Sequence, residues 1–153
     1  MTILVKLRDI LLDKTLYVVS VHLHWRGGDS MAKQLLEVTS YVDDLITTNE
    51  DCLGVVVGGD FNYTYGRGIS NYQDDMIKNA SLMVLNPRDR ETTCHDAKLD
   101  WIFWKPGGGS ASMREEVGHR WAVAAVERSK KKLESSGCSP SDHTLVAATL
   151  RIE

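Results

Sequence analysis

The stretch Leu53-Gly-Val-Val-Val-Gly-Gly-Asp-Phe-Asn62 decides how this 153-residue chain is organised. Its first half is a short, almost uninterrupted apolar run, which predicts a strand buried on both faces. The strand delivers the carboxylate of Asp60 and, two residues on, the carboxamide of Asn62 to the same side. Carboxylate and carboxamide oxygens are hard ligands that suit Mg²⁺ at an open rim. A structural alternative, an Asx-turn at the end of a strand, explains the same two residues equally well.

The segments that precede this strand indicate an α/β or α+β layered fold. Residues 2–8 and 15–23 are β-rich and predict a hairpin that turns around Asp13. Asp29 or Ser30 is expected to cap an amphipathic crossover helix, because apolar residues recur after them at helical spacing. These apolar residues are Met31, Leu35, Val38, Val42 and Leu45.

The later part of the chain continues the alternation of helix and strand. Residues 70–80 are compatible with a helix, and residues 86–96 are rich in turn-forming and charged types, as expected for a loop. Further strands are predicted at 98–104, 116–127 and 143–152. Because the chain opens directly in a strand, we expect a single partial domain over residues 1–153 whose amino-terminal strands are missing.

Composition places the chain among soluble globular proteins, with 42% hydrophobic and 25% charged residues. The net charge of −3 gives no global attraction for nucleic acid, so a polyanionic substrate requires a local patch or a bound cation. No stretch has the roughly 20 apolar residues of a membrane span, and residues 1–12 lack the features of a signal peptide. Three widely separated cysteines favour reduced, structural thiols. We therefore expect an intracellular protein, cytoplasmic or nuclear.

Two further motifs carry candidate chemistry at strand ends. The strand Val18-Val-Ser-Val-His-Leu23 ends in a histidine, His22. In Ser139-Pro-Ser-Asp-His-Thr144, Asp142 can bind a metal while the adjacent His143 handles a proton or a phosphate oxygen. Each motif by itself also fits an ordinary interpretation, a structural histidine on a strand or an acid and histidine in a surface loop.

Asp100 interrupts the apolar, aromatic strand Leu99-Asp-Trp-Ile-Phe103. A carboxylate buried there costs several kcal/mol unless it is paired. We pair it with His143, which it would orient and make more basic; the alternative is an acid pointing to solvent from an edge strand. The intervals between successive candidates are 38 residues from His22 to Asp60, 40 from Asp60 to Asp100, and 42 from Asp100 to Asp142. Each excursion of the chain can therefore return to the same edge of a sheet.

In this order the four motifs resemble the endonuclease/exonuclease/phosphatase superfamily of DNase-I-like enzymes, over essentially the whole chain. The resemblance rests on the succession His-Leu, Gly-Asp-Phe-Asn, Leu-Asp-Trp-Ile-Phe and Ser-Asp-His. It implies a DNase-I-like two-sheet α/β sandwich and a hydrolase that cleaves phosphodiester bonds by in-line attack of water. Mg²⁺ or Mn²⁺ would neutralise the developing charge. A nucleic-acid substrate, and hence a nuclease, is the leading interpretation.

The resemblance also implies roles for individual residues. Asp60 and Asn62 would hold the attacking water or a metal. Asp142 and His143 would complete the metal and phosphate site, and Asp100 would orient His143. His22 would contact the scissile phosphate. The earlier strands, which supply an Asn and a metal-binding Glu in the family, have no counterpart here. The alternatives are a catalytically inactive binding module of the same fold, or a phosphatase- or sphingomyelinase-type phosphoesterase. Trp25, Tyr63, Tyr65 and Trp101 are candidates for stacking on bases, against the more usual place of such residues in a core.

Overall fold

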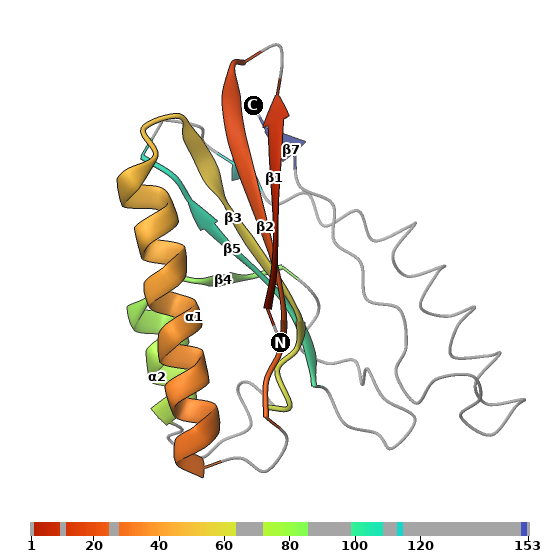
Figure 1. Cartoon of the computed structure of the whole chain (residues 1–153), viewed down its shortest axis with the longest axis vertical. Coiled ribbons are helices and arrows are strands. Elements are labelled where there is room, and N and C mark those ends of the chain that lie inside the picture. Colours follow the sequence, from red (N-terminus) through yellow and green to blue (C-terminus); the bar gives the residue numbers. More distant parts are fainter. Residues whose placement is uncertain are drawn as a thin grey trace, which may run out of the picture.

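The computed structural model of the chain describes residues 2–9, 12–24, 28–63, 72–85, 99–108, 113–114 and 151–152. The elements follow in the order β1 (Thr2–Asp9), β2 (Lys14–His22), α1 (Gly28–Thr48), β3 (Cys52–Asp60), α2 (Tyr72–Asn79), β4 (Met83–Val84), β5 (Asp100–Pro106), β6 (Met113–Arg114) and β7 (Arg151–Ile152). Five strands form one sheet in the order β1-β2-β3-β5-β4, and β6 pairs with β7. Figure 1 shows α1 and α2 on one side of the five-stranded sheet.

The predicted hairpin is confirmed. β1 and β2 pair antiparallel, from Thr2 opposite Val21 to Asp9 opposite Lys14. Asp13, in the turn between them, has a φ of 52°, a left-handed conformation that aspartate tolerates better than most residues do. The turn therefore forms where the sequence predicts it.

The crossover helix brings β3 beside β2. The two strands pair in parallel, from Thr15 opposite Cys52 to His22 opposite Asp60, as strands joined by a helix do. α1 begins at Gly28, so Asp29 lies in its first turn and not at its cap. This corrects the predicted start by a residue or two; in the first turn the carboxylate of Asp29 still interacts favourably with the unpaired backbone N–H groups. The helix buries its apolar positions as predicted, at Met31, Leu35, Val38, Val42 and Leu45.

The main core lies between the helices and the face of the sheet that they cover. Residues alternate along β2, so Tyr17, Val19 and Val21 are buried against the helices. Phe61 and Phe103 add an edge-to-face pair with ring centroids 5.0 Å apart, a geometry that contributes about 0.5–1.5 kcal/mol beyond area burial. No helix in the described part of the chain is both long and apolar enough to span a membrane.

The remaining predicted elements are only partly described. β5 begins at Asp100, inside the predicted strand 98–104, and α2 lies inside the predicted helical stretch 70–80. β4 has no counterpart in the prediction, because two residues carry no periodicity. The loop predicted at 86–96, the strand at 116–127 and most of the strand at 143–152 lie outside the described residues.

Cys52 is a free, fully buried thiol at the start of β3. Burial raises its pKa, because the thiolate would lose its hydration. This agrees with a structural thiol, while Cys94 and Cys138 lie outside the described residues.

Asp51 joins three strands at the end of the sheet where β3 begins. Its carboxylate accepts hydrogen bonds from the Thr15 hydroxyl of β2 at 2.7 Å and from the Arg8 guanidinium of β1 at 2.9 Å. The backbone N–H of Thr15 also donates to the Asp51 carbonyl oxygen at 2.9 Å. The hydrogen bond from Thr15, supported by the charge of Arg8, lowers the pKa of Asp51.

We predict that Asp51→Asn lowers the melting temperature by about 1–3 °C at neutral pH. A folded-state pKa below the unfolded value of about 3.9 stabilises the protein above that value, and the contribution is lost as pH falls through the folded-state pKa. Thermal melting between pH 7 and pH 3 should therefore show the difference from wild type closing on acidification. Glu50→Gln, which removes the same charge from an exposed neighbour, is the control. A difference that stays constant down to pH 3 would contradict this account.

Candidate active site at the end of the central strands

Three of the predicted site residues form a row across the sheet. The register of β2 and β3 places His22 opposite Asp60, and the register of β3 and β5 places Asp60 opposite Asp100. Residues opposite each other in a sheet point to the same face, with Cβ atoms about 4.5–5.5 Å apart. His22, Asp60 and Asp100 therefore share one face at the ends of three neighbouring strands. Their spacing in the sequence predicts a return to the same edge of the sheet, but not a common face.

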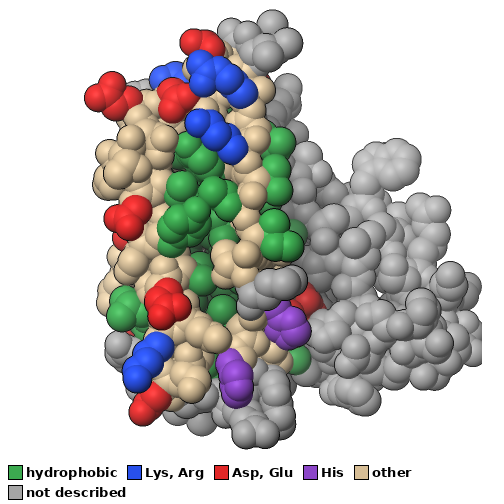
Figure 2. Space-filling view, viewed as in Figure 1, with side chains coloured by type: hydrophobic (Ala, Val, Ile, Leu, Met, Phe, Trp, Pro, Cys, Tyr) green, Lys and Arg blue, Asp and Glu red, His purple; other side chains and the backbone are tan. Residues whose placement is uncertain are grey.

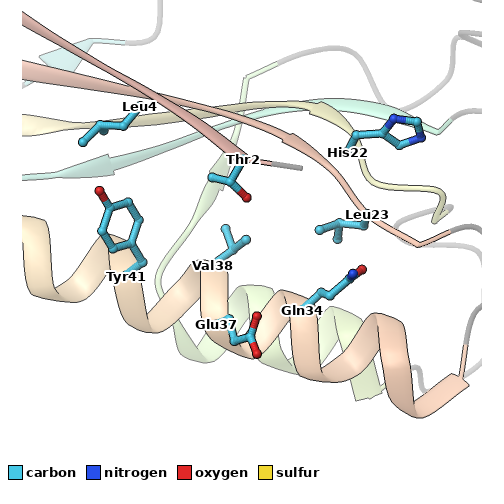
Figure 3. Close-up of a pocket in the computed structure, with 8 residues that line it drawn as sticks. All are labelled: Thr2, Leu4, His22, Leu23, Gln34, Glu37, Val38 and Tyr41. Atoms are coloured by element: carbon cyan, nitrogen blue, oxygen red, sulfur yellow. The ribbon is translucent and has the colours of Figure 1, made fainter.

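The row lies on the face of the sheet that α1 does not cover. In Figure 3 the imidazole of His22 points away from α1, whereas Leu23, the next residue, points toward the helix. The Nε2 atom of His22 lies 3.5 Å from Oδ2 of Asp60. The His22 side chain is 64% exposed and that of Asp60 only 16%. An exposed imidazole thus lies beside a largely buried carboxylate at the ends of the central strands.

Asn62 folds back onto Asp60. Its backbone N–H donates to Oδ1 of Asp60 at 2.7 Å. Its side-chain Nδ2 donates to the Leu23 carbonyl oxygen at 2.9 Å and to Oδ2 of Asp60 at 3.3 Å. The Asx-turn left open by the sequence is therefore present, and Asn62 has a left-handed φ of 49°. Because these side-chain hydrogen bonds use Nδ2, the carbonyl oxygen Oδ1 is the atom that Asn62 can offer to a cation or a water.

Gly59 permits the close approach of β3 to β2 next to the site. Its φ is 141°, and a Cβ at this position would lie 2.0 Å from the carbonyl oxygen of Val21. Only glycine fits a backbone in this conformation at this distance. The residues that follow Val21 and Gly59 are His22 and Asp60, so the close approach sets the relative position of the imidazole and the carboxylate.

Asp142 and His143 lie outside the described residues, so the pairing of Asp100 with His143 stays a prediction. Over the ranges that the structure describes, no group of three His, Cys, Asp or Glu side chains is arranged to hold a metal ion. The neighbouring position of Asp60 and Asp100 was not part of the prediction. Each is separately recognisable as an acid at a strand end, but strand order and register are needed to pair them.

The aromatic residues nearest the row belong to the core. Trp101 is fully buried and Tyr63 is 7% exposed, so neither presents a face on which a base could stack. A place in the core, the more usual one for such residues, is therefore confirmed for Trp101 and Tyr63. Trp25 and Tyr65 lie outside the described residues.

A groove of about 470 Å³ runs between β1 and α1 on the opposite face of the sheet, lined by Thr2, Leu4, His22, Leu23, Gln34, Glu37, Val38 and Tyr41. Figure 2 shows hydrophobic side chains gathered in the hollow beside the helix. Although His22 contributes to the lining, its ring points away from α1 in Figure 3. The groove and the row of site residues are therefore on different faces.

Comparison with solved structures identifies similar folds. The human Nocturnin catalytic domain, solved with a bound sulfate anion, matches 99% of this chain and 53% of its own length, with 14% identity and a TM-score of 0.65. Beta toxin from Staphylococcus aureus matches 68% of this chain and 42% of its own length at 19% identity, with a TM-score of 0.44. A mutant of that toxin with bound magnesium ions matches 73% and 44% at 18% identity, with a TM-score of 0.46. No protein-family model matches the chain, and no curated protein sequence matches it.

The likeness to Nocturnin is one of fold. Together with the mixed five-stranded sheet under two helices, it confirms the predicted α/β class. The chain spans about half the length of that solved domain.

We predict that Gly59→Ala destabilises the protein by about 2–4 kcal/mol, because the new Cβ meets the backbone of Val21 and the φ is strained. Gly58→Ala is the matched control, since a Cβ at Gly58 would meet its nearest atom, on Ile102, at an ordinary 3.7 Å. Its effect should stay within about 1 kcal/mol. Urea denaturation of the two variants beside wild type measures the difference, and equal midpoints for both would refute the close-approach explanation.

Proposed function

We propose that this chain carries part of the active site of a divalent-metal-dependent phosphoesterase that hydrolyses phosphodiester bonds, with a nuclease as the leading assignment. The observation that carries the proposal is the row His22–Asp60–Asp100, set by register on one face of the sheet. Two carboxylates beside an accessible imidazole are the groups that metal-assisted hydrolysis of a phosphate ester uses. The likeness to Nocturnin supports the fold on which such a site would be built.

The donor groups fit a hard divalent cation such as Mg²⁺ or Mn²⁺. Like charges directly opposite each other on neighbouring strands are destabilising, and a cation near Asp60 and Asp100 would offset that repulsion. Asp60 and the Oδ1 atom of Asn62 would hold the cation together with Asp142 and His143, the oxygen-rich set with an open side that Mg²⁺ prefers. When bound, the cation supplies charge neutralisation at the phosphate.

Residues of the chain would orient the water, contact the phosphate and orient His143. Asp60, which accepts a hydrogen bond from the Asn62 backbone N–H, would orient a water molecule at the ends of the strands. His22, whose side chain is 64% exposed, would donate a hydrogen bond to a phosphate oxygen. Asp100 would orient His143, because a carboxylate that accepts an imidazole N–H selects the tautomer and raises the basicity of the other nitrogen.

Nucleic acid is the proposed substrate class. With a net charge of −3, attraction for a polyanion has to come from the bound cation and local groups and not from the protein as a whole. Nocturnin, the neighbour of similar fold, holds a sulfate anion, which has the tetrahedral shape of a phosphate. A single partial domain and a cytoplasmic or nuclear location remain part of the proposal.

We predict that wild-type protein cleaves at least one of three substrates, plasmid DNA, RNA oligonucleotides or bis-p-nitrophenyl phosphate, with Mg²⁺ or Mn²⁺ and not with EDTA. Asp60→Asn should lower kcat by about 10²–10³-fold, because it removes the charge that orients the attacking water and the cation. Asp75→Asn, which removes the same charge from an exposed position on α2, should retain activity.

The outcomes separate the proposed function from its alternatives. Preferred cleavage of plasmid or RNA over the small diester supports a nuclease, and the reverse supports another phosphoesterase. A folded wild-type chain that cleaves nothing in any metal would reject the enzyme and favour an inactive module of the same fold. Full activity in Asp60→Asn would show that the site has been assigned to the wrong residues.

A further inference from the structure

The backbone just after Asn62 is held from the core side by Trp101. The indole Nε1–H of Trp101 donates to the carbonyl oxygen of Tyr63 at 2.8 Å, and both groups are buried. Trp101 is opposite Gly59 in the register of β3 and β5, so it approaches the site from beneath the sheet. Its side chain is fully buried and cannot touch a substrate on the other face.

The same residue, Tyr63, is held from a second direction. Its phenolic hydroxyl donates to the carboxylate of Asp74 on α2. On the other side of Asn62, the backbone N–H of Phe61 donates to the carbonyl oxygen of Leu99 at 2.9 Å. Residues 61–63 are thus attached at one end to Leu99, the residue just before β5. At the other end they are attached to Trp101 of β5 and to Asp74 of α2.

This attachment helps to fix the backbone conformation of Asn62. Asn62 has a left-handed φ of 49°, which asparagine tolerates better than most residues do but which its surroundings still have to select over the commoner right-handed and extended conformations. In this conformation Asn62 contacts Asp60 through its backbone N–H and through Nδ2. If residues 61–63 relaxed, both contacts would lengthen and the carboxylate would lose its orientation.

We propose that Trp101 is a positioning residue for hydrolysis, which holds the Tyr63 carbonyl and thereby keeps Asn62 against Asp60, with the Tyr63–Asp74 hydrogen bond as a second support. The inference rests on the proposed function of the same site. A misplacement of about 1 Å at a reacting group can lower the rate by about a hundredfold. Loss of this hydrogen bond from Trp101 should lower kcat and leave substrate binding largely unchanged, because Trp101 contacts only the residues that orient the attacking group.

Trp104 provides a matched control on the same strand. It is 1% exposed, comparable to Trp101, and its Nε1 has no hydrogen-bond partner in the described part of the chain. Replacing either tryptophan by phenylalanine removes a similar amount of buried apolar surface. Only the change at Trp101 also removes the hydrogen bond to Tyr63.

The test compares Trp101→Phe, Trp104→Phe and Tyr63→Phe in the complete chain, on the substrate that wild type cleaves. Trp101→Phe should lower kcat by about tenfold with KM within about twofold, and Trp104→Phe should leave both within about twofold. Tyr63→Phe, which keeps the ring and is the milder change, should lower kcat by about threefold. In an Asp60→Asn background, Trp101→Phe should have no further effect, because the group it positions is already lost.

A second measurement does not depend on activity. In ¹⁵N-labelled protein, Trp101→Phe should shift the side-chain amide signals of Asn62, and Trp104→Phe should leave them in place. Equal kcat values for the two tryptophan variants, or unmoved Asn62 signals in Trp101→Phe, would overturn the proposal. If Trp101→Phe does not fold, unchanged kcat and unmoved Asn62 signals in Tyr63→Phe would overturn it instead. If the wild type cleaves nothing, the proposed function and the proposed effect of Trp101 on kcat are both overturned. The Asn62 signals then still decide whether Trp101 sets the conformation of Asn62.

Discussion

The close approach of β3 to β2 at Gly59 is the constraint on which the site depends. No side chain separates the two backbones there, since a Cβ on Gly59 would lie 2.0 Å from the Val21 carbonyl oxygen. The strands can therefore stay in parallel register to their last residues, and that register places His22 opposite Asp60. Pairing of β5 on the other side of β3 then adds Asp100 to the same row. One glycine thus allows three chemically active side chains from distant parts of the sequence to share a face.

The two faces of the sheet have different roles, one in the hydrophobic core and the other in the candidate site. The face under α1 and α2 carries the core, including Val19, Val21 and Phe103, and it supplies the rigidity that a site at the strand ends needs. The opposite face carries the polar row at one end. Because alternate residues of one strand serve both faces, Trp101 packs in the core directly after Asp100 in the row. A single peptide unit of β5 therefore joins a core residue to a residue of the row.

Hydrogen bonds to the backbone hold the ends of β2 and β3 together at the site. Asn62 reaches the Leu23 carbonyl oxygen at the end of β2, and the backbone N–H of Leu23 donates to the Asp60 carbonyl oxygen. The ends of the two strands are thereby joined in both directions, one residue beyond the row. The Asx-turn at Asp60 and a role in binding a cation or water do not exclude each other. The turn consumes donors of Asn62, and its side-chain carbonyl oxygen is still able to accept a hydrogen bond or bind a cation.

The sequence by itself determined the elements whose residues repeat with a period or end in a distinctive type. The hairpin, α1 and β3 were predicted because apolar residues recur in them at strand or helix spacing, and His22, Asp60 and Asp100 were recognised as polar residues at strand ends. Only the tertiary structure decided which strands are neighbours, and therefore that Asp60 lies opposite Asp100 and that Trp101 contacts the residue after Asn62. These are contacts over 38 to 40 residues of chain, and no local pattern encodes them because sheet order and register depend on how all the strands pack together.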